Sequence, residues 1–575
     1  MQHILKKYYH ILVIITIACV IVFPRRSGYV MLLDFFTVPE YSWDFLDLYS
    51  GLAWIILEII KILLGGMVMQ YLVMMGSLIG LGLGAYYLIK EVKADIIPWA
   101  HRSGIIFMMI NPFLYARMVE GQYGVYGGYA LLLWACYFLY RRYKKGMLSD
   151  LVWWMVLAGL TVSLSYHALF FVGLASTLIL ISNHRRWKNI LYRSGSMIAI
   201  CILNFNRIGA SMLGNNYVSQ VLKHVDTGHI TSFQTQQGSE GLLYHVLSLH
   251  GFRGEGQGRF ITPFSLNPYW TYIFGLLFLL IVYGYYRPWK SVGDKTLAIW
   301  LGSVAIISYI LALGISGPGY IGQLTQWLYD HIPYYIGLRE PQKWLGMLMI
   351  IYAVGLALGG HKLYKRVIAD DPFFTWPLRI LLILLPMVYT PTMLFALKGQ
   401  LQVFSYPEDY VQAKEYIYSV TSPKESCQSE QCFDILVLPW HQYMSLSFTN
   451  KIAPNPWDRY FQSYDNRSLN ILVGDNMELS DIYTQSSRPA SKIIEHYVHP
   501  SQGLRASGKI DKETSGAWCD DVNGLGISGI LLMKELERQR DKHYLDALVA
   551  HGYASLDHET NTTFFYRLDC GGLEN

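Results

Sequence analysis

Charged residues are scarce in this sequence: Asp, Glu, Lys and Arg make up 15% of its 575 residues, whereas 53% are hydrophobic. A chain this long and this apolar does not form one soluble domain. The net charge of +5 is small for the length and comes from short basic clusters between apolar runs, which argues against nucleic acid as a partner. The sequence therefore predicts a polytopic α-helical membrane protein in contact with membrane lipids.

The sequence also lacks a signal-peptide cleavage site and cysteine pairs in CxxC spacing. No small-residue cleavage site follows the first apolar run, so we expect an uncleaved first span with its N-terminus in the cytoplasm. No cysteine pair has CxxC spacing, which disfavours a zinc site at the cysteines. Their even number in the polar C-terminal part instead favours disulfides on an oxidising, extracytoplasmic side, with four free thiols as the alternative: Cys427, Cys432, Cys519 and Cys570.

Long apolar runs are abundant. Because about 20 apolar residues cross a bilayer, the chain predicts about eleven spans, at residues 8–23, 65–89, 96–115, 125–140, 151–164, 168–181, 195–208, 269–286, 296–313, 345–359 and 376–396. The fifth and sixth are short, and we expect a break between them at residues 165–167. Residues 49–61, just before the second span, have the pattern of a helix that lies in the membrane interface.

The basic clusters set the orientation. All five loops that this count places inside are rich in Lys and Arg: residues 90–102, 141–145, 185–193, 287–295 and 362–366. Positive charge concentrates on the cytoplasmic side of membrane proteins. Arg25 and Arg26 argue the other way but do not outweigh the set. The protein is therefore expected to be integral to the cytoplasmic membrane, with its large loops and everything after Lys398 extracytoplasmic.

The first outer loop is acidic. Residues 28–47 carry Asp34, Glu40, Asp44 and Asp47 between two apolar runs. Because charge is costly inside a bilayer, this loop should lie at a water-facing membrane edge. Asp44 and Asp47 are one helical turn apart and are candidate ligands for a divalent cation, Mg²⁺ or Mn²⁺. One face of an interfacial helix is the commoner explanation of that spacing.

Three outer segments hold candidate substrate-binding residues. The segment 111–134 begins with Asn-Pro, which favours a helix break. The segment 338–344 carries a cationic pair four residues apart, which could grip a lipid-linked phosphate. The alternative for 111–134 is a polar turn between helices, and that for 338–344 is a snorkelling membrane anchor. The alternative for the third segment, at residue 167, is a structural histidine. The candidates are Arg117, Glu120 and Gln122, then His167 at the expected break, then Arg339, Glu340 and Lys343.

The composition changes sharply after residue 399. Short β-prone runs such as 433–438 and 563–567 alternate with helical stretches such as 529–548. We therefore expect two domains: a multi-span membrane domain, residues 1–399, and a C-terminal extracytoplasmic α/β domain, residues 400–575.

The acidic first loop, the Asn-Pro segment, the LREPQKW turn and the outer tail together resemble the GT-C superfamily of integral-membrane glycosyltransferases, over about residues 1 to 400. The likeness is to prokaryotic arabinofuranosyl- and mannosyltransferase-like members. It implies transfer of a sugar, usually with inversion, from a polyprenyl-phosphate donor to an extracytoplasmic glycan, lipid or protein acceptor in cell-envelope biosynthesis. By position, Asp34 would be the catalytic general base, and Arg339 and Lys343 would neutralise the departing phosphate.

The chain departs from that pattern in two places. The first loop holds a single Asp34 in place of a DxD or ExD pair, which puts the divalent metal in doubt, and the tail lacks the WWDYG sequence of oligosaccharyltransferases. A transporter or flippase of lipid-linked glycans is the alternative function, but it should place ionisable groups at mid-span, whereas here they gather at one face. A surface scaffold would not need so many spans.

Overall fold

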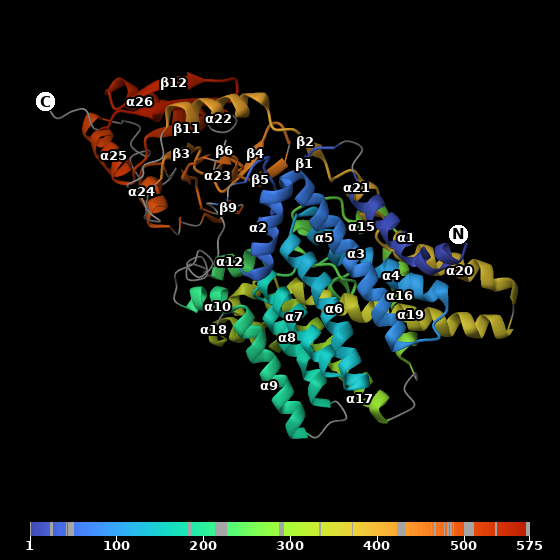
Figure 1. The fold of residues 1–575 in the computed structure, drawn as a ribbon. Helices are drawn as coiled ribbons and strands as arrows, with labels where there is room; N and C mark the ends of the chain where they lie inside the picture. Colours follow the sequence, from blue (N-terminus) through green and yellow to red (C-terminus); the bar gives the residue numbers. More distant parts are fainter. Residues whose placement is uncertain are drawn as a thin grey trace.

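The computed structural model describes residues 2–23, 27–41, 43, 51–181, 186–212, 227–286, 292–332, 335–370, 372–421, 433–449, 451–461, 463–464, 467–476, 478–479, 482–483, 486, 488–498, 511–534 and 538–570. The helices up to residue 398 form a bundle, and the residues after 400 form an α/β part at one end of it (Figure 1).

Three helical stretches among the described residues are long and apolar enough to cross a membrane. They are Gly66–Val92, which is α3; Lys295–Ser316, which includes most of α17 (Val292–Leu313); and Pro341–Val367, which includes most of α19 (Leu345–Asp370). A pair bent by 75°, α20 (Thr375–Tyr389) with Pro391–Lys398, makes a fourth if it counts as one span. The fold is thus that of a largely helical protein in which a few helices are long and apolar enough to cross a membrane.

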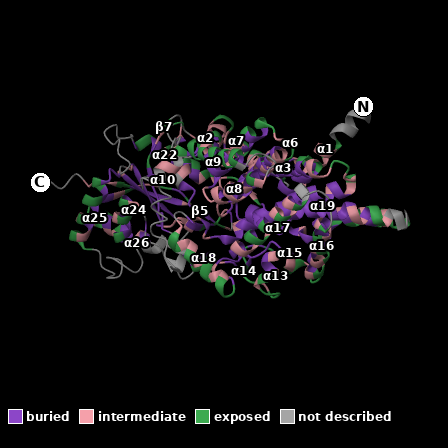
Figure 2. Cartoon of the chain, turned by 90° about the horizontal axis from the view of Figure 1, so that it is seen from below, coloured by how far each residue is buried: buried purple, intermediate pink, exposed green. Residues whose placement is uncertain are grey.

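Helix α19 lies at the centre of the bundle (Figure 2). Its residues 345–361 are all buried, whereas its C-terminal end reaches the surface. It packs against α4 (Pro98–Met109) and α16 (Trp270–Tyr285). A Cβ on Gly359 would lie 1.9 Å from the Leu280 carbonyl oxygen, and one on Gly284 would lie 2.1 Å from the Gly355 oxygen. Glycine therefore permits α16 and α19 to approach at backbone contact, as in membrane helix pairs.

Each of the apolar runs predicted as a span coincides with helix. The helices are α1 (Gln2–Val22), α3, α4 with α5 (Pro112–Val119), α6 (Tyr123–Lys145), α7 (Leu148–Leu164), α8 (Ala168–Ser176), α9 (Arg186–Leu203) with α10 (Phe205–Met212), α16, α17, α19 and α20. The helix expected before the second span is α2 (Leu52–Leu64). Several of these helices are shorter than a span needs.

Breaks occur where short polar residues satisfy the backbone. Asn111 caps α5, because its Oδ1 accepts the Leu114 N–H at 2.9 Å, and the predicted break there is confirmed. The break between α7 and α8 at residues 165–167 is also confirmed. The run 195–208, expected as one helix, is two: Asn204 lies between them and its Nδ2 donates to Gly159 and Ile200 carbonyl oxygens at 3.1 and 2.9 Å.

Shorter helices lie in the segments between and after these longer ones. They are α12 (Thr227–Ser232), α13 (Leu242–Leu247), α14 (Arg253–Gly256), α15 (Pro263–Leu266), α18 (Tyr320–His331) and α21 (Leu394–Lys398).

The C-terminal part is built on a five-stranded mixed sheet in the order β12 (Ala554–Glu559), β13 (Thr563–Leu568), β11 (Gly529–Met533), β3 (Ile435–Leu438) and β8 (Ile471–Leu472). Strands β11, β3 and β8 run parallel, and β13 is antiparallel to β11. Alternate residues face opposite sides: Val437 and Leu531 pack with α22 (Glu408–Val420), whereas Leu436 and Leu532 pack with α24 (Pro489–Val498), α25 (Lys512–Gly524) and α26 (Arg538–Ala550). Helices therefore cover both faces of the sheet.

The stretch 529–548, expected as helix, was only partly correct. Its first five residues form the central strand β11, and the helix α26 begins at Arg538. All five residues of β11 are buried, and a short continuous apolar run is typical of a parallel strand covered on both faces. The strands expected near 433–438 and 563–567 are present as β3 and β13.

Cys519 and Cys570 form a disulfide, as the even cysteine number predicted; Cys427 and Cys432 lie outside the described residues. The loop after α1, which was predicted to lie outside, joins the two parts of the chain. Strand β1 (Tyr29–Val30) pairs with β2 (Val403–Phe404), and Met31 and Val38 belong to the hydrophobic core of the C-terminal part. The loop that carries Asp34 is therefore held between the bundle and the tail.

Candidate functional site

Asp34 lies in a tight turn. The backbones of Leu32 and Phe35 exchange two hydrogen bonds, of 2.8 and 3.3 Å, and the Asp34 N–H donates to the Glu120 carbonyl oxygen at 2.9 Å. Gly121 has a φ of +79°, and a Cβ there would lie 2.7 Å from the Phe35 Cβ. Only glycine suits that position, so the turn docks closely on the end of α5.

Gln70 fixes the same loop to the membrane helix α3. Its buried side chain donates from Nε2 to the Gly28 carbonyl oxygen at 2.7 Å and accepts at Oε1 from the Val30 N–H at 2.9 Å and the Thr37 hydroxyl at 3.0 Å. A buried amide whose hydrogen bonds are made is rigid. The backbone on either side of Asp34 is thus positioned by a residue from the bundle.

The Asp34 carboxylate is half-buried and receives hydrogen bonds from both parts of the chain. Gln122 Nε2 donates to its Oδ2 at 3.0 Å, and the hydroxyl of Tyr443, in β4 (Tyr443–Leu446), donates to its Oδ1 at 3.3 Å. Burial raises the pKa of Asp34; the charge of Arg253 and the two hydrogen bonds oppose that rise without cancelling it. A carboxylate of raised pKa is a stronger base than an ordinary aspartate.

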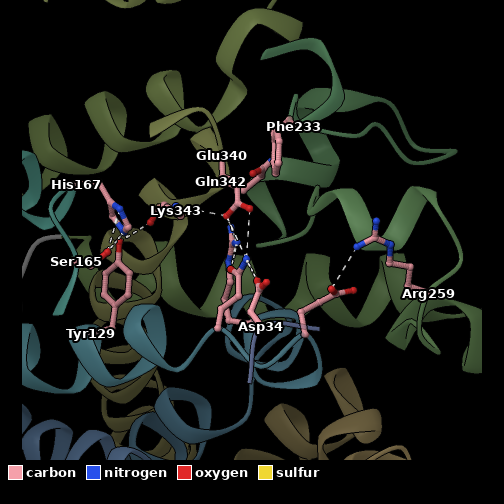
Figure 3. Close-up of polar contacts among 12 residues, drawn as sticks. Asp34, Tyr129, Ser165, His167, Phe233, Arg259, Glu340, Gln342 and Lys343 are labelled. Carbon is pink, nitrogen blue, oxygen red and sulfur yellow. Dashed lines mark hydrogen bonds and ion pairs between the residues drawn. The ribbon is translucent and has the colours of Figure 1, made fainter. Parts of the chain in front are cut away.

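Arg117 and Glu340 form a buried ion pair behind Asp34. Arg117 is fully buried in α5, and its Nη1 donates to Glu340 Oε2 at 2.7 Å; Lys343 Nζ lies 3.5 Å from the same oxygen. Gln122 bridges the pair to Asp34, since its Nε2 also lies 3.3 Å from Glu340 Oε1 (Figure 3). Burial opposes ionisation of Glu340, but the charges of Lys343 and Arg117 outweigh it and hold its pKa well below the usual range.

Two further arginines approach one aromatic ring. The guanidinium carbon of Arg253 lies 4.0 Å from the Phe233 ring centroid, and that of Arg339 lies 4.7 Å from it. Arg253 is 6% exposed, and within the described part of the chain its Nε and Nη1 find no hydrogen-bond partner. Its charge acts on Asp34 and Glu340. A buried guanidinium with donors to spare is suited to an anion.

Glu120 is buried on the other side of the Asp34 turn. Its Oε2 lies 3.5 Å from Arg259 Nη1 (Figure 3), and a Cβ on Gly254 would lie 2.6 Å from its Oε1. Burial raises the pKa of Glu120 to about 7, against the opposing charge of Arg259. This carboxyl therefore gains or loses its proton near neutral pH.

A cavity of about 360 Å³ opens beside Asp34, between the bundle and the C-terminal part. The bundle side contributes Asp34, Phe36 and Tyr123, and the tail contributes Gln442, Tyr443, Pro454, Asn455, Arg459, Val473, Gly474, Asp475 and Arg488. Its volume lies within the range of about 300–1,000 Å³ that is usual for small-molecule sites. The tail therefore forms most of the wall that faces Asp34.

The structure brings most of the predicted residues together. Asp34, Gln122, Glu340, Arg117 and Lys343 form one network, and Glu120 contacts the same turn through its backbone. Arg339 lies beside that network on the Phe233 ring.

Three other predicted residues stand apart. His167 contacts Ser165 (Figure 3). It also packs against Phe171, which packs in turn on Trp344. Asp44 and Asp47, the candidate metal ligands, lie outside the described residues.

Four contributors were missed by sequence reasoning: Tyr443, Arg253, Arg259 and Phe233. The arginines lie in the long outer segment between α10 and α16, with no local pattern to mark them, and Tyr443 comes from the tail. The one signal in the sequence for the segment between α10 and α16 was its predicted position outside the membrane.

Chemically, the arrangement couples a carboxylate base to an excess of positive charge. Arg117, Arg253, Arg339 and Lys343 all act on Glu340. These four cations face two carboxylates of the network, Glu340 and Asp34, so positive charge is in excess. The site is thus prepared to accept a further anion beside Asp34. No protein-family model matches this chain, and no curated protein matches it either.

Proposed function

We propose that this chain is a multi-pass membrane glycosyltransferase of the GT-C type, which moves a sugar from a polyprenyl-phosphate donor to an extracytoplasmic acceptor. The observation that carries the proposal is the placement of Asp34: its half-buried carboxylate faces a cavity, with an excess of buried and half-buried cations next to it. Acid–base chemistry and anion binding are thereby brought to adjacent positions.

In the proposed reaction, Asp34 takes the proton from an acceptor hydroxyl as that oxygen attacks the anomeric carbon. The bond between the anomeric carbon and the phosphate oxygen breaks, and its electron pair leaves with the lipid phosphate. Arg253, Arg339 and Lys343 neutralise the charge that develops there. Attack opposite to the leaving group inverts the anomeric configuration.

The topology of the proposal follows from the apolar runs. About eleven helices cross the cytoplasmic membrane, with local thinning of the bilayer or end-to-end pairing across a break at the short ones, and the acidic loop and the tail lie outside. The Cys519–Cys570 disulfide suits an oxidising compartment. The tail then closes the acceptor side of the cavity, where Tyr123 offers an aromatic ring to a sugar face.

The position of the charges favours an enzyme over a transporter. Asp34, Gln122 and Glu340 lie in the connections before or after long helices, at one end of the bundle. A transporter of lipid-linked glycans needs a substrate site near the bilayer midplane, reached from both sides in turn. An enzyme that meets its lipid donor at one leaflet needs charge at only one end.

A direct test uses proteoliposomes that contain the purified chain and polyprenyl-phosphate donors with labelled sugars. We expect release of free polyprenyl phosphate in step with transfer of the label. Movement of intact donor between leaflets, without breakdown of the donor, would support the transporter instead.

The anion site has its own test. Arg253→Met should reduce kcat/KM for the donor by about 10- to 100-fold, since hydrogen bonds to a charged group contribute about 1.5–3 kcal/mol. Arg567→Met is the matched control, because Arg567 pairs with Asp557 on the tail surface. Equal activity of the two variants would remove Arg253 from the site.

A further inference from the structure

A second cluster of functional groups lies in the outer segment that carries Arg253. His245 in α13, His250 in the following turn and Glu255 in α14 each offer one ligand atom, and these atoms all lie within 4.8 Å of one another. The two short helices lie at one edge of the bundle (Figure 2). None of the three residues belongs to the Asp34 network.

The distances within the cluster fit a bound ion. His245 Nε2 lies 3.2 Å from Glu255 Oε2, and His250 Nδ1 lies 3.1 Å from Glu255 Oε1. Ligands at 2.0–2.1 Å from a tetrahedral zinc ion are separated by about 3.3 Å. The space between the three ligand atoms could therefore hold an ion with little movement of the chain.

The surroundings hold these ligands in place. The Gly251 N–H donates to Glu255 Oε2 at 2.9 Å and orients the carboxylate, as outer partners of metal ligands do. Gly251 has a φ of +108°, which favours glycine at this turn. The rings of Phe264 and Trp270 pack against His250 and shield the cluster from water.

We propose that His245, His250 and Glu255 bind one divalent transition-metal ion of the zinc class, which fixes α14 in place. Two imidazoles and one carboxylate select zinc or a similar ion over Mg²⁺ or Ca²⁺, which prefer oxygen ligands throughout. Three protein ligands leave a fourth position for water.

The ion would act on the Asp34 site through α14. This helix has four residues, too few to be stable alone. It carries Arg253 onto Phe233 and places Gly254 against Glu120, so a metal held by Glu255 keeps both contacts in register. The effect on transfer rests on the proposed function, whereas metal binding does not.

The test measures metal rather than activity. The purified full-length chain is stripped with a chelator, supplied with Zn²⁺ alone, passed through gel filtration and analysed for zinc by mass spectrometry. We expect about one zinc per chain in the wild type and a higher melting temperature with zinc, because a ligand that binds only the native state stabilises it. Co²⁺ should give the visible absorption of a four-coordinate site.

Variants separate this site from adventitious binding. Glu255→Gln keeps the shape of the side chain but removes its charge, and it should retain less than about a tenth of the zinc, as metal ligands must be deprotonated. His250→Ala should lose zinc to the same extent. His331→Ala, on the exposed α18, is the control and should bind as the wild type does.

Two results would overturn the proposal. One is a wild-type chain that retains no zinc after titration; this result stands even if a variant fails to fold. The other is Glu255→Gln retaining as much zinc as the wild type, which would mark the cluster as a buried ion-pair network only. A wild-type chain that binds zinc but transfers no sugar would instead count against the proposed function and leave the metal site standing.

Discussion

The bundle and the tail hold their ion pairs in opposite environments. Arg117 and Glu340, in the bundle, have side chains that are 0% and 7% exposed, whereas Arg567 and Asp557, in the tail, are 50% and 23% exposed. Taking two charges out of water is costly and is not an efficient way to gain stability. Stability alone therefore does not account for the buried pair at the end of the bundle, whereas the exposed pair of the tail costs little to form.

The largest expected effect comes from breaking the buried pair. Arg117→Met leaves Glu340 without its closest partner and should lower the free energy of unfolding by about 3–5 kcal/mol. Arg567→Met should cost less than about 1 kcal/mol, since its pair is exposed. Thermal unfolding in detergent, followed for both variants, measures the difference.

The double variant Arg117→Met/Glu340→Gln tests whether the charge of Glu340, left without Arg117, causes that loss of stability. Because it removes both charges, it should recover much of the lost stability while sugar transfer stays low. Equal destabilisation by Arg117→Met and Arg567→Met would contradict the distinction between the two regions.

The bundle and the tail also differ in how their carboxyl groups should make stability depend on pH. Burial raises the pKa of Glu120 from an ordinary value of 4.5 to about 7. The native state therefore holds this proton more tightly than the unfolded state does. The stability it contributes is fully present below pH 4.5 and is lost as the pH rises through about 7, by about 3 kcal/mol in all.

Glu120→Gln removes this titration. The melting temperature of the variant should gain on that of the wild type as the pH rises from about 5 to about 8. Asp557→Asn, on the tail surface, should show no such trend. Parallel pH profiles for the wild type and Glu120→Gln would show that Glu120 does not titrate in this range.

The smallest expected effect tests the contact between the two regions. Tyr443→Phe removes the tail hydroxyl that donates to Asp34, a hydrogen bond that contributes about 0.5–1.5 kcal/mol. Transfer should fall by about 2- to 10-fold. Because that hydrogen bond favours the ionised carboxylate, its loss raises the pKa of Asp34 and moves the acidic limb of the pH–rate profile to higher pH.

Tyr497→Phe is the matched control for Tyr443→Phe. Tyr497 also donates to a carboxylate, that of Asp521, but within the tail. An acidic limb that moves equally in both variants, or in neither, would argue against the closure of the site by the tail.

Local patterns were enough to predict the helices and several of their ends. The apolar runs located the helices, and Asn111 with Pro112 marked a break because a short polar side chain caps the next helix. The strand β11 was mistaken for helix, since a run of five apolar residues fits both until the sheet that covers it is known. The number of membrane crossings stays a prediction beyond the few helices that are long enough by themselves.

The sequence located most residues of the site, but it indicated which of them contact each other only where they lie near one another in the chain. Glu340 and Lys343 are three residues apart and were found together. One partner of Glu340 is Arg117, 223 residues away, and one partner of Asp34 is Tyr443, 409 residues away. Such pairings depend on how the helices and the tail pack, which no local spacing encodes. The His245, His250 and Glu255 cluster was missed although its residues are close in the chain, because the turn between α13 and α14, and no regular spacing, brings their side chains together.

The most direct test of the central claim compares Asp34→Asn with Asp95→Asn in the transfer assay, both variants having been shown to be folded. Asp95 is an exposed aspartate between α3 and α4 that pairs with Lys93, so the two variants make the same chemical change at different places. If Asp34 is the base, Asn there should reduce the rate of transfer by about 10²- to 10⁴-fold, and Asp95→Asn should leave it unchanged. Undiminished transfer by Asp34→Asn would contradict the account and turn attention to Glu120.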